Sequence, residues 1–274
     1  MKYTRASLKY IFGNFGYLIL FGVIPAAFLA YSMDAAAVQR VISHYVSGAP
    51  YEGFPDLFHA VSIINFRSGS AVAAQVLGIA VGVVCVAMML AFIEKHMRIG
   101  KRTWNGLFSK LNDNLLSTLS ITLLFAAIYE LWALIASALL LCVSFIGNRA
   151  AVCILSAAVL FGTETVLLYV ISAFYLWLPC LQITGFRSFE ALRYSYQLVA
   201  GVKGKIVRSQ FISLTLAEVA LGSASLFVSS AWAVFAIAVV IFTFLILLFV
   251  TRMQAVYFDC AQIERADLKT YYCD

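Results

Sequence analysis

The sequence predicts an all-α fold, a polytopic membrane bundle of six transmembrane helices. Of the 274 residues, 63% are hydrophobic and 12% are charged, whereas roughly 25% of the residues of a soluble domain are charged. Apolar runs of about 20 residues, the length that crosses a hydrocarbon core of about 30 Å, recur six times. Lysine and arginine gather in alternate segments between these runs, as in membrane proteins that obey the positive-inside rule. Lipid is therefore the expected solvent for much of the chain.

The six predicted spans cover residues 11–32, 70–93, 115–142, 151–178, 209–229 and 231–252. The first run follows the basic residues Lys2, Arg5 and Lys9, as the apolar part of a signal peptide would. Because this run is too long for a signal peptide and has no clear small-residue cleavage site, we expect it to remain as the first span. No other stretch is long enough for a separate soluble domain, so residues 1–274 are expected to form a single integral membrane domain.

The placement of charge predicts which ends of the spans face the cytoplasm. Sixteen of the 19 lysines and arginines lie in residues 1–10, 94–113, 179–208 and 252–274. The three exceptions are Arg40, Arg67 and Arg149. The positive-inside rule therefore predicts a multi-pass protein of the cell membrane with both termini in the cytoplasm. The net charge of +6 is explained by anionic lipid headgroups at the inner face, without a nucleic-acid partner.

Two predicted cytoplasmic loops share one sequence pattern. The stretch "GKRTWNGL" at 100–107 matches "GFRSFEAL" at 185–192 as G-x-R-[ST]-[WF]-x-[GA]-L. Thr103 and Ser188 are suited to cap helices, and apolar residues follow at spacings of three and four. We expect two amphipathic elbow helices in the inner interface, with aromatic rings toward the acyl chains and cations toward phosphates. The elbow residues are Arg102, Thr103, Trp104, Leu107, Arg187, Ser188, Phe189, Leu192 and Arg193.

The matched elbows also predict an internal repeat of residues 70–142 and 151–229. "SITL" at 120–123 and "SLTL" at 213–216 follow the two elbows in the same order. Because both elbows lie on the same predicted side, the two copies would have the same topology and be related by an axis along the membrane normal.

Residues 177–205, "WLPCLQITGFRSFEALRYSYQLVAGVKGK", combine a proline at the end of a span, a Ser-Phe-Glu-Ala-Leu-Arg helix and a glycine break. In this pattern the chain resembles a broad family of six-helix bacterial membrane proteins, which includes the membrane domain fused to some glycerophosphodiester phosphodiesterases. The resemblance covers 177–205 closely and the remainder by topology alone. It implies a membrane location and no particular activity. Because no segment of the sequence is expected to fold as the hydrolase, phosphodiester cleavage is not carried over.

The external segment 33–69 is the only sizeable one. Asp34 and Pro55 predict the starts of two short helices, which either lie on the outer interface or form a lid over a central cavity. In the second span, Gly78 and Gly82 have the GxxxG spacing that allows close helix packing, within the chain or between copies. Cys142 and Cys153 flank a short outer turn and are either a disulfide in an oxidising exterior or two buried thiols.

Three acids lie inside predicted spans: Glu130, Glu164 and Glu218. At about 1.5 Å per residue, Glu218 lies near the midplane, while Glu130 and Glu164 lie at similar depth on consecutive antiparallel spans and can face each other. No basic residue lies in a span core, and burial favours the neutral carboxyl group. We therefore expect at least one of Glu130 and Glu164 to be protonated at neutral pH. Such acids indicate a proton or cation site, or else neutral side chains that hydrogen-bond between helices.

Three classes of function remain open. The first is a structural or accessory protein of the bacterial cell envelope whose elbows bind membrane lipids and dock a cytoplasmic protein partner. The second is a small transporter or permease subunit, with the three acids as its proton or cation site. The third, an intramembrane enzyme, lacks support because the sequence has no GxSxG, HExxH, Walker A or Rossmann motif. We expect no enzyme activity, metal site or cofactor, and the scarcity of charge in the first and last spans favours the accessory interpretation.

Overall fold

The computed structural model describes residues 2–47 and 52–268, apart from the side chains of residues 108–114. Its described part consists of α-helices and one 3₁₀ turn, without a β-strand. Six helical segments are long and apolar enough to cross a membrane. The prediction of an all-α membrane bundle is therefore confirmed.

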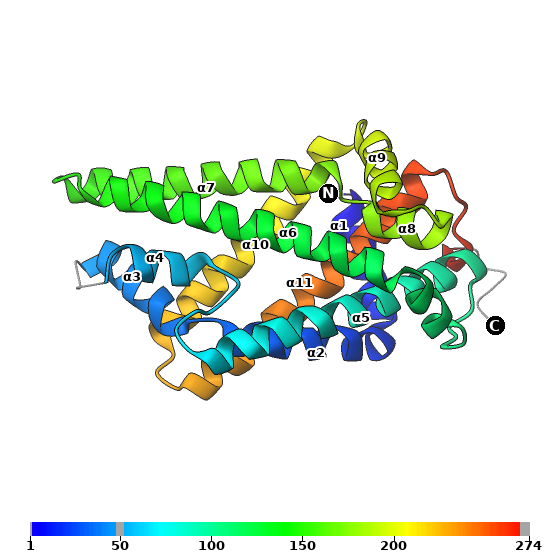
Figure 1. Ribbon diagram of the computed structural model, residues 1–274, viewed down its shortest axis with the longest axis horizontal. Helices are drawn as coiled ribbons and strands as arrows, with labels where there is room; N and C mark the ends of the chain where they lie inside the picture. Colours follow the sequence, from blue (N-terminus) through cyan, green and yellow to red (C-terminus); the bar gives the residue numbers. More distant parts are fainter. Residues whose placement is uncertain (1, 48–51, 269–274) are drawn as a thin grey trace.

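The helices are α1 (Lys2–Gly13), α2 (Phe15–Ser32), α3 (Ala35–Ser47), α4 (Phe54–Val61), α5 (Gly69–Ile99), α6 (Leu107–Ser144), α7 (Arg149–Ala173), α8 (Trp177–Thr184), α9 (Ser188–Val199), α10 (Lys203–Phe227) and α11 (Ala231–Cys260), followed by the 3₁₀ turn η1 (Ala266–Leu268). The candidate spans are α2, α5, α6, the α7–α8 pair, α10 and α11. Helices α1, α8 and α9 lie toward one end of the bundle, and α3 and α4 lie at the other (Figure 1). The helix ends near α1, α8 and α9 carry most of the lysines and arginines, and we therefore call this end of the bundle the basic end.

The predicted first span, 11–32, is too long at its start. The helix breaks at Asn14, whose side-chain amide donates to the carbonyl of Tyr10 at 2.9 Å, and α2 begins at Phe15. Residues 2–13 form a separate amphipathic helix that packs on α11, and Figure 1 shows it turned away from the direction of α2. Its cations point outward while Tyr3 donates to Asp259 of α11 at 2.6 Å. From the sequence, residues 1–10 were expected to be a cytoplasmic segment and the span to begin at residue 11.

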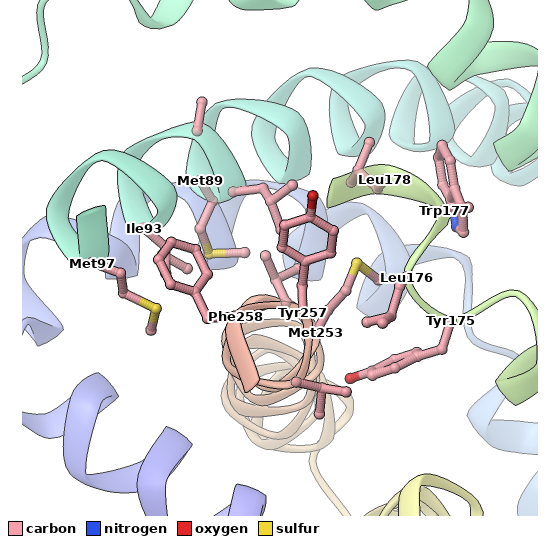
Figure 2. Close-up of a cluster of buried hydrophobic side chains, with 14 of the residues drawn as sticks. Met89, Ile93, Met97, Tyr175, Leu176, Trp177, Leu178, Met253, Tyr257 and Phe258 are labelled. Atoms are coloured by element: carbon pink, nitrogen blue, oxygen red, sulfur yellow. The ribbon is translucent and has the colours of Figure 1, made fainter. Parts of the chain in front are cut away.

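The hydrophobic core lies toward the basic end, where α2, α5, α8 and α11 meet. Helix α2 packs against both α5 and α11. In Figure 2, methionine and isoleucine side chains of α5 face Met253, Tyr257 and Phe258 of α11, and the chain between α7 and α8 closes the cluster. Helices α5 and α11 continue past their predicted ends, to Ile99 and Cys260, because most residues beyond those ends, as far as Met97 and Phe258, are buried in this core.

Close helix packing in the core depends on glycine. A Cβ atom added to Gly78 of α5 would lie 2.7 Å from Cβ of Phe28 on α2, and one added to Gly22 of α2 would lie 3.1 Å from Leu247 and Thr243 on α11. The first distance leaves no room for a side chain, and the second allows one only if its neighbours shift. Of the two glycines in the GxxxG spacing, Gly78 therefore serves helix packing within the chain, whereas a Cβ atom added to Gly82 would lie at an ordinary contact distance of 3.7 Å from Pro25.

Helices α6 and α7 form a long antiparallel hairpin that runs along the length of the molecule (Figure 1). Helix α6 has 38 residues, about 57 Å at 1.5 Å per residue, which exceeds a hydrocarbon core of about 30 Å. Large apolar side chains are exposed along both helices, among them Leu116, Leu131, Ile154 and Val166. A membrane accounts for this exposure because lipid covers such surfaces without cost.

Within residues 33–69 the chain forms the two short helices that the sequence predicts. Asp34 accepts a hydrogen bond from the backbone of Ala37 at 2.9 Å, and Pro55 lies in the first turn of α4. Helix α3 packs against α10, and α4 packs against α6. A pocket of about 330 Å³ lies where α3 meets α2, α10 and α11, with Tyr31, Gln39, Ser225 and Ser229 among its lining residues.

Candidate functional site

Glu130 on α6 holds the chain segment that follows α4. Its Oε1 accepts hydrogen bonds from the backbone N–H groups of Ile63 at 3.0 Å and Ile64 at 3.1 Å. Its Oε2 accepts one from the Ser62 hydroxyl at 2.8 Å. The neighbouring Tyr129 donates to the carbonyl of Val61, the last residue of α4, at 3.0 Å. Residues 129 and 130 therefore fasten the end of α4 to α6.

Glu164 on α7 is fully buried, and neither carboxyl oxygen has a hydrogen-bond partner in the described part of the chain. Glu218 on α10 is partly buried and lies within electrostatic range of Glu164. Tyr129 lies within electrostatic range of all three acids. The acids therefore gather around Tyr129, near α7, which packs against both α6 and α10. The carboxyl group of Glu164 is buried there without a hydrogen-bond partner among the described residues.

From the sequence, Glu130 and Glu164 were expected to face each other, but in the structure each has different neighbours. Glu130 directs its carboxylate toward residues 62–64, and Glu164 interacts electrostatically with Glu218. The reason is that the segment after α4 reaches down beside α6 to Glu130, about 21 Å from the end of that helix at 1.5 Å per residue. The depth estimated from the number of helical residues considers only the spans and therefore does not account for this segment.

A basic residue, Arg252, lies inside the bundle, where the sequence predicts none. Arg252 was assigned to the cytoplasmic tail, but α11 continues eight residues beyond it, to Cys260. Arg252 is 2% exposed, and its Nη2 donates to the hydroxyl of Ser213 on α10 at 2.8 Å. The sequence becomes more polar after residue 250 but shows no interruption of the helix. This continuity was the available signal that Arg252 lies within α11.

The first predicted elbow is helical only from Leu107 onward, as the start of α6. Gly100 ends α5 with a φ of 79°, residues 101–106 are not helical, and α6 begins at Leu107. Thr103 therefore caps no helix. Trp104 packs its ring 5.4 Å from that of Phe21 and 5.8 Å from that of Phe92. These contacts with α2 and α5 fold the loop back against the bundle.

Arg102 and Leu107 also contact the bundle in this loop. Arg102 lies over the ring of Tyr17, 5.7 Å from its centroid, and Leu107 is 2% exposed. The sequence pattern that unites the two elbows is matched in structure at one point: Gly185 ends α8 with a φ of 71°, as Gly100 ends α5. Glycine suits both places because a side chain disfavours positive φ. The internal repeat itself stays a prediction.

The second elbow is the helix α9, which lies across the direction of α7 (Figure 1). Ser188 is its first residue rather than its cap, and Glu190 accepts a hydrogen bond from the backbone of Arg187 at 3.1 Å. The buried face consists of Ala191, Ser195 and Val199. Small residues at a spacing of four let α9 approach closely, and the hydroxyl of Ser195 accepts a hydrogen bond from Leu176 at 2.9 Å.

Two aromatic residues of α9 face outward, while Tyr194 and Leu198 pack against the core. Phe189 is 87% exposed and Tyr196 is 56% exposed, with the exposed Arg193 between them on the same side; Leu192 is partly buried. We call Phe189, Arg193 and Tyr196 the α9 stripe. The ring of Tyr196 lies 6.1 Å from that of Phe174, at the end of α7. The stripe therefore continues the outer surface of a spanning helix.

A cluster of charged residues joins α3, α4 and the start of α5. The carboxylate of Asp56 is fully buried and accepts two hydrogen bonds from Arg40, at 2.8 and 3.0 Å, and another from Arg67. The backbone of Glu52 donates to it at 2.8 Å, and Arg67 also contacts Asp34 at 2.9 Å. Burial alone would raise the pKa of Asp56, but the hydrogen bonds from Arg40 and Glu52 and the charge of Arg67 hold it below its usual value.

Other candidate groups contribute less. Cys142 and Cys153 are free thiols, and Cys153 lies 3.4 Å from the carbonyl of Tyr45. The described residues contain no group of three or more histidines, cysteines and acids arranged to hold a metal ion.

Six long apolar helices with exposed apolar surfaces define an integral membrane protein of the all-α class. Comparisons of the chain with family models, curated proteins and solved structures find no match. The resemblance of residues 177–205 to the six-helix bacterial family therefore stays a prediction.

Proposed function

We propose that this protein is a structural or accessory component of the bacterial cell membrane that binds anionic lipid at its basic end. In this proposal both termini lie in the cytoplasm, and α9 lies in the inner interface. A cytoplasmic protein partner would dock on the same end, beside the lipid headgroups. Positive charge at the cytoplasmic ends of spans is the general rule for such proteins.

The α9 stripe is the observation that supports this function best. A helix across the bundle with two exposed aromatic rings and an arginine between them has the form of an interfacial anchor. Nearby, the ammonium group of Lys203 lies 3.4 Å from the ring centroid of Tyr169 on α7. Aromatic residues and cations are both enriched where a helix leaves the acyl region. Because the rings continue the outer surface of α7, we assign them to lipid contact rather than to a protein partner.

Lipid retention tests the proposal. Replacing Arg187 and Arg193 with glutamine should lower the preference for phosphatidylglycerol over phosphatidylcholine about fivefold per arginine, because each cation near an anionic surface contributes about 1 kcal/mol. The ratio of the two lipids retained after purification in mild detergent is measured by mass spectrometry. The matched control is Arg149→Gln, which removes an exposed cation at the opposite end of the bundle and should leave the ratio unchanged. Equal ratios for the wild type and the double variant would remove the support for an α9 anchor.

A second candidate function is a small transporter or permease subunit that uses Glu164 and Glu218 as a proton or cation site. The observation in its favour is the full burial of Glu164 without a hydrogen-bond partner. An intramembrane acid that packing alone does not require indicates a functional site. Glu130 is a weaker member because its hydrogen bonds to residues 62–64 give it a structural role.

Proton flux decides between the two functions. In proteoliposomes that contain a pH-sensitive dye, the accessory function predicts the same flux with and without the protein under an imposed potential. Transport predicts a protein-dependent flux that Glu164→Gln abolishes and that Glu190→Gln, on the surface of α9, leaves unchanged. A flux that survives Glu164→Gln would exclude Glu164 as the site.

A further inference from the structure

The span formed by α7 and α8 is interrupted inside the bundle. Residues 174–176 are not helical, although the segment Arg149–Thr184 is apolar enough to form a continuous span. The interruption is held from two sides: Ser195 of α9 accepts the N–H of Leu176 at 2.9 Å, and Tyr175 donates its hydroxyl to a backbone carbonyl of α11 at 2.8 Å. Breaks of this kind in membrane helices occur where the backbone is buried in protein or lines a binding site.

Arg252 lies beside this break. It is on α11, one turn from the carbonyl of Phe249 that Tyr175 contacts, and it interacts electrostatically with Tyr175. At 1.5 Å per residue it lies about 12 Å from the end of α11. Its Nη2 donates to Ser213, while its Nε is buried without an acceptor. Within the described residues, Arg252 forms no ion pair.

A second donor without an acceptor lies on the facing helix. Gln210 of α10 is 5% exposed. Its Oε1 accepts a hydrogen bond from Ser172 of α7 at 3.1 Å, and its buried Nε2 lies near the hydroxyl of Tyr175 but forms no hydrogen bond of normal length. Gln210 precedes Ser213 by three residues and therefore shares its helix face. The Nε of Arg252 and the Nε2 of Gln210 are thus unpaired donors at the same junction of α7, α10 and α11.

A buried guanidinium group requires compensation by negative charge. Removing one from water is costly, and a hydroxyl partner offsets only a small part of that cost. The planar guanidinium group binds carboxylate and phosphate oxygens through two parallel hydrogen bonds. With one cation and neutral donors around it, this junction has the charge and the donor set for an oxyanion that carries a single negative charge.

We infer that the α7–α8 break, with Arg252 and Gln210, is a binding site for a singly charged oxyanion, a carboxylate or a phosphodiester. Arg252 supplies the charge and its Nε–H, and Gln210 supplies its amide N–H. The anion is either the polar group of a membrane amphiphile or a soluble ion. This site is separate from the α9 stripe and from Glu164, so it does not depend on the proposed function.

Thermal unfolding in detergent tests the inference, because a ligand that binds only the folded state raises the unfolding temperature. The probes are oleate, phosphatidylglycerol, acetate and inorganic phosphate. The variants are Arg252→Met, which keeps the length of the side chain without its charge, Gln210→Leu, and the control Arg5→Met. At least one probe should raise the unfolding temperature of the wild type and of Arg5→Met. The same probe should bind Arg252→Met and Gln210→Leu at least about tenfold more weakly.

The pattern of probes identifies the source of the anion. Stabilisation by oleate or phosphatidylglycerol alone supports a membrane amphiphile, and stabilisation by acetate or phosphate as well supports a soluble ion. If every probe shifts the wild type, Arg252→Met and Gln210→Leu equally, the inference is overturned. If Arg252→Met does not fold, the comparison of Gln210→Leu with the wild type decides: equal binding of every probe overturns the site.

Discussion

Replacing Asp56 with alanine is expected to lower the free energy of unfolding by about 3 kcal/mol and to release α3 and α4 from each other. The substitution leaves Arg40 and Arg67 without their shared buried carboxylate, and breaking a buried ion pair costs about 3 to 5 kcal/mol. We expect the lower end of that range, because the side chain of Arg40 keeps 33% of its surface exposed and regains water. Unfolding in mixed detergent micelles, followed by circular dichroism, measures the change.

Glu52 provides the matched control for Asp56. Its side chain is 61% exposed and contacts only Arg67 in the same cluster, and the hydrogen bond from residue 52 to Asp56 comes from the backbone. Glu52→Ala should therefore leave stability almost unchanged, as is usual for exposed ion pairs. Equal losses for the two variants would show that the cluster acts through general charge balance rather than through the buried carboxylate.

The same cluster predicts a dependence of stability on pH. The folded-state pKa of Asp56 lies below its usual value because the hydrogen bonds and charges of its partners outweigh burial. The stability that it contributes is thus fully present above the unfolded-state pKa of about 4 and is lost as the pH falls through the lower folded-state pKa. Wild-type protein should lose more stability in that acidic window than Asp56→Ala does.

Much of the fold follows from local features of the sequence. Hydrophobic length is enough to find the cores of six spans, because a membrane requires about 20 apolar residues whatever the neighbouring helices are. Asp34 and Pro55 mark the starts of α3 and α4 correctly, because capping and the fixed φ of proline act within one turn.

The features that were missed depend on contacts between distant residues. Trp104 follows a capping residue at helical spacing, yet its ring packs on Phe21 and Phe92, and the loop is not helical. The burial of Arg252 depends on the packing of α11 beyond the apolar run. In α9 the packed face is set by Ala191 and Ser195, which a hydrophobic pattern ranks below Phe189 and Tyr196. In each case the structure depends on the size of a side chain and on the position of its partner, and neither can be read from composition.

Replacing Glu130 with alanine is expected to lower the free energy of unfolding by about 2 kcal/mol, within the range for hydrogen bonds to a charged group. The backbone N–H groups of Ile63 and Ile64 lose their acceptor. Their amide hydrogen exchange should therefore become faster, while exchange in the core near Met253 should be unchanged. Exchange followed by mass spectrometry after digestion in detergent separates these two regions.

Glu130→Gln distinguishes the hydrogen bonds of Glu130 from its charge. Glutamine retains an oxygen that can accept from both N–H groups, and its amide can donate to the hydroxyl of Ser62, so this variant should remain within about 1 kcal/mol of the wild type. A proton or cation site would instead require the ionisable group and lose its activity with glutamine. Slow exchange at Ile63 and Ile64 in Glu130→Gln, together with fast exchange in Glu130→Ala, would assign Glu130 to holding the segment that follows α4. Fast exchange in both variants would show that its charge is essential there. Because the bonds to residues 62–64 occupy both carboxyl oxygens, we expect the first result, which leaves Glu164 as the acid of this group to test for proton movement.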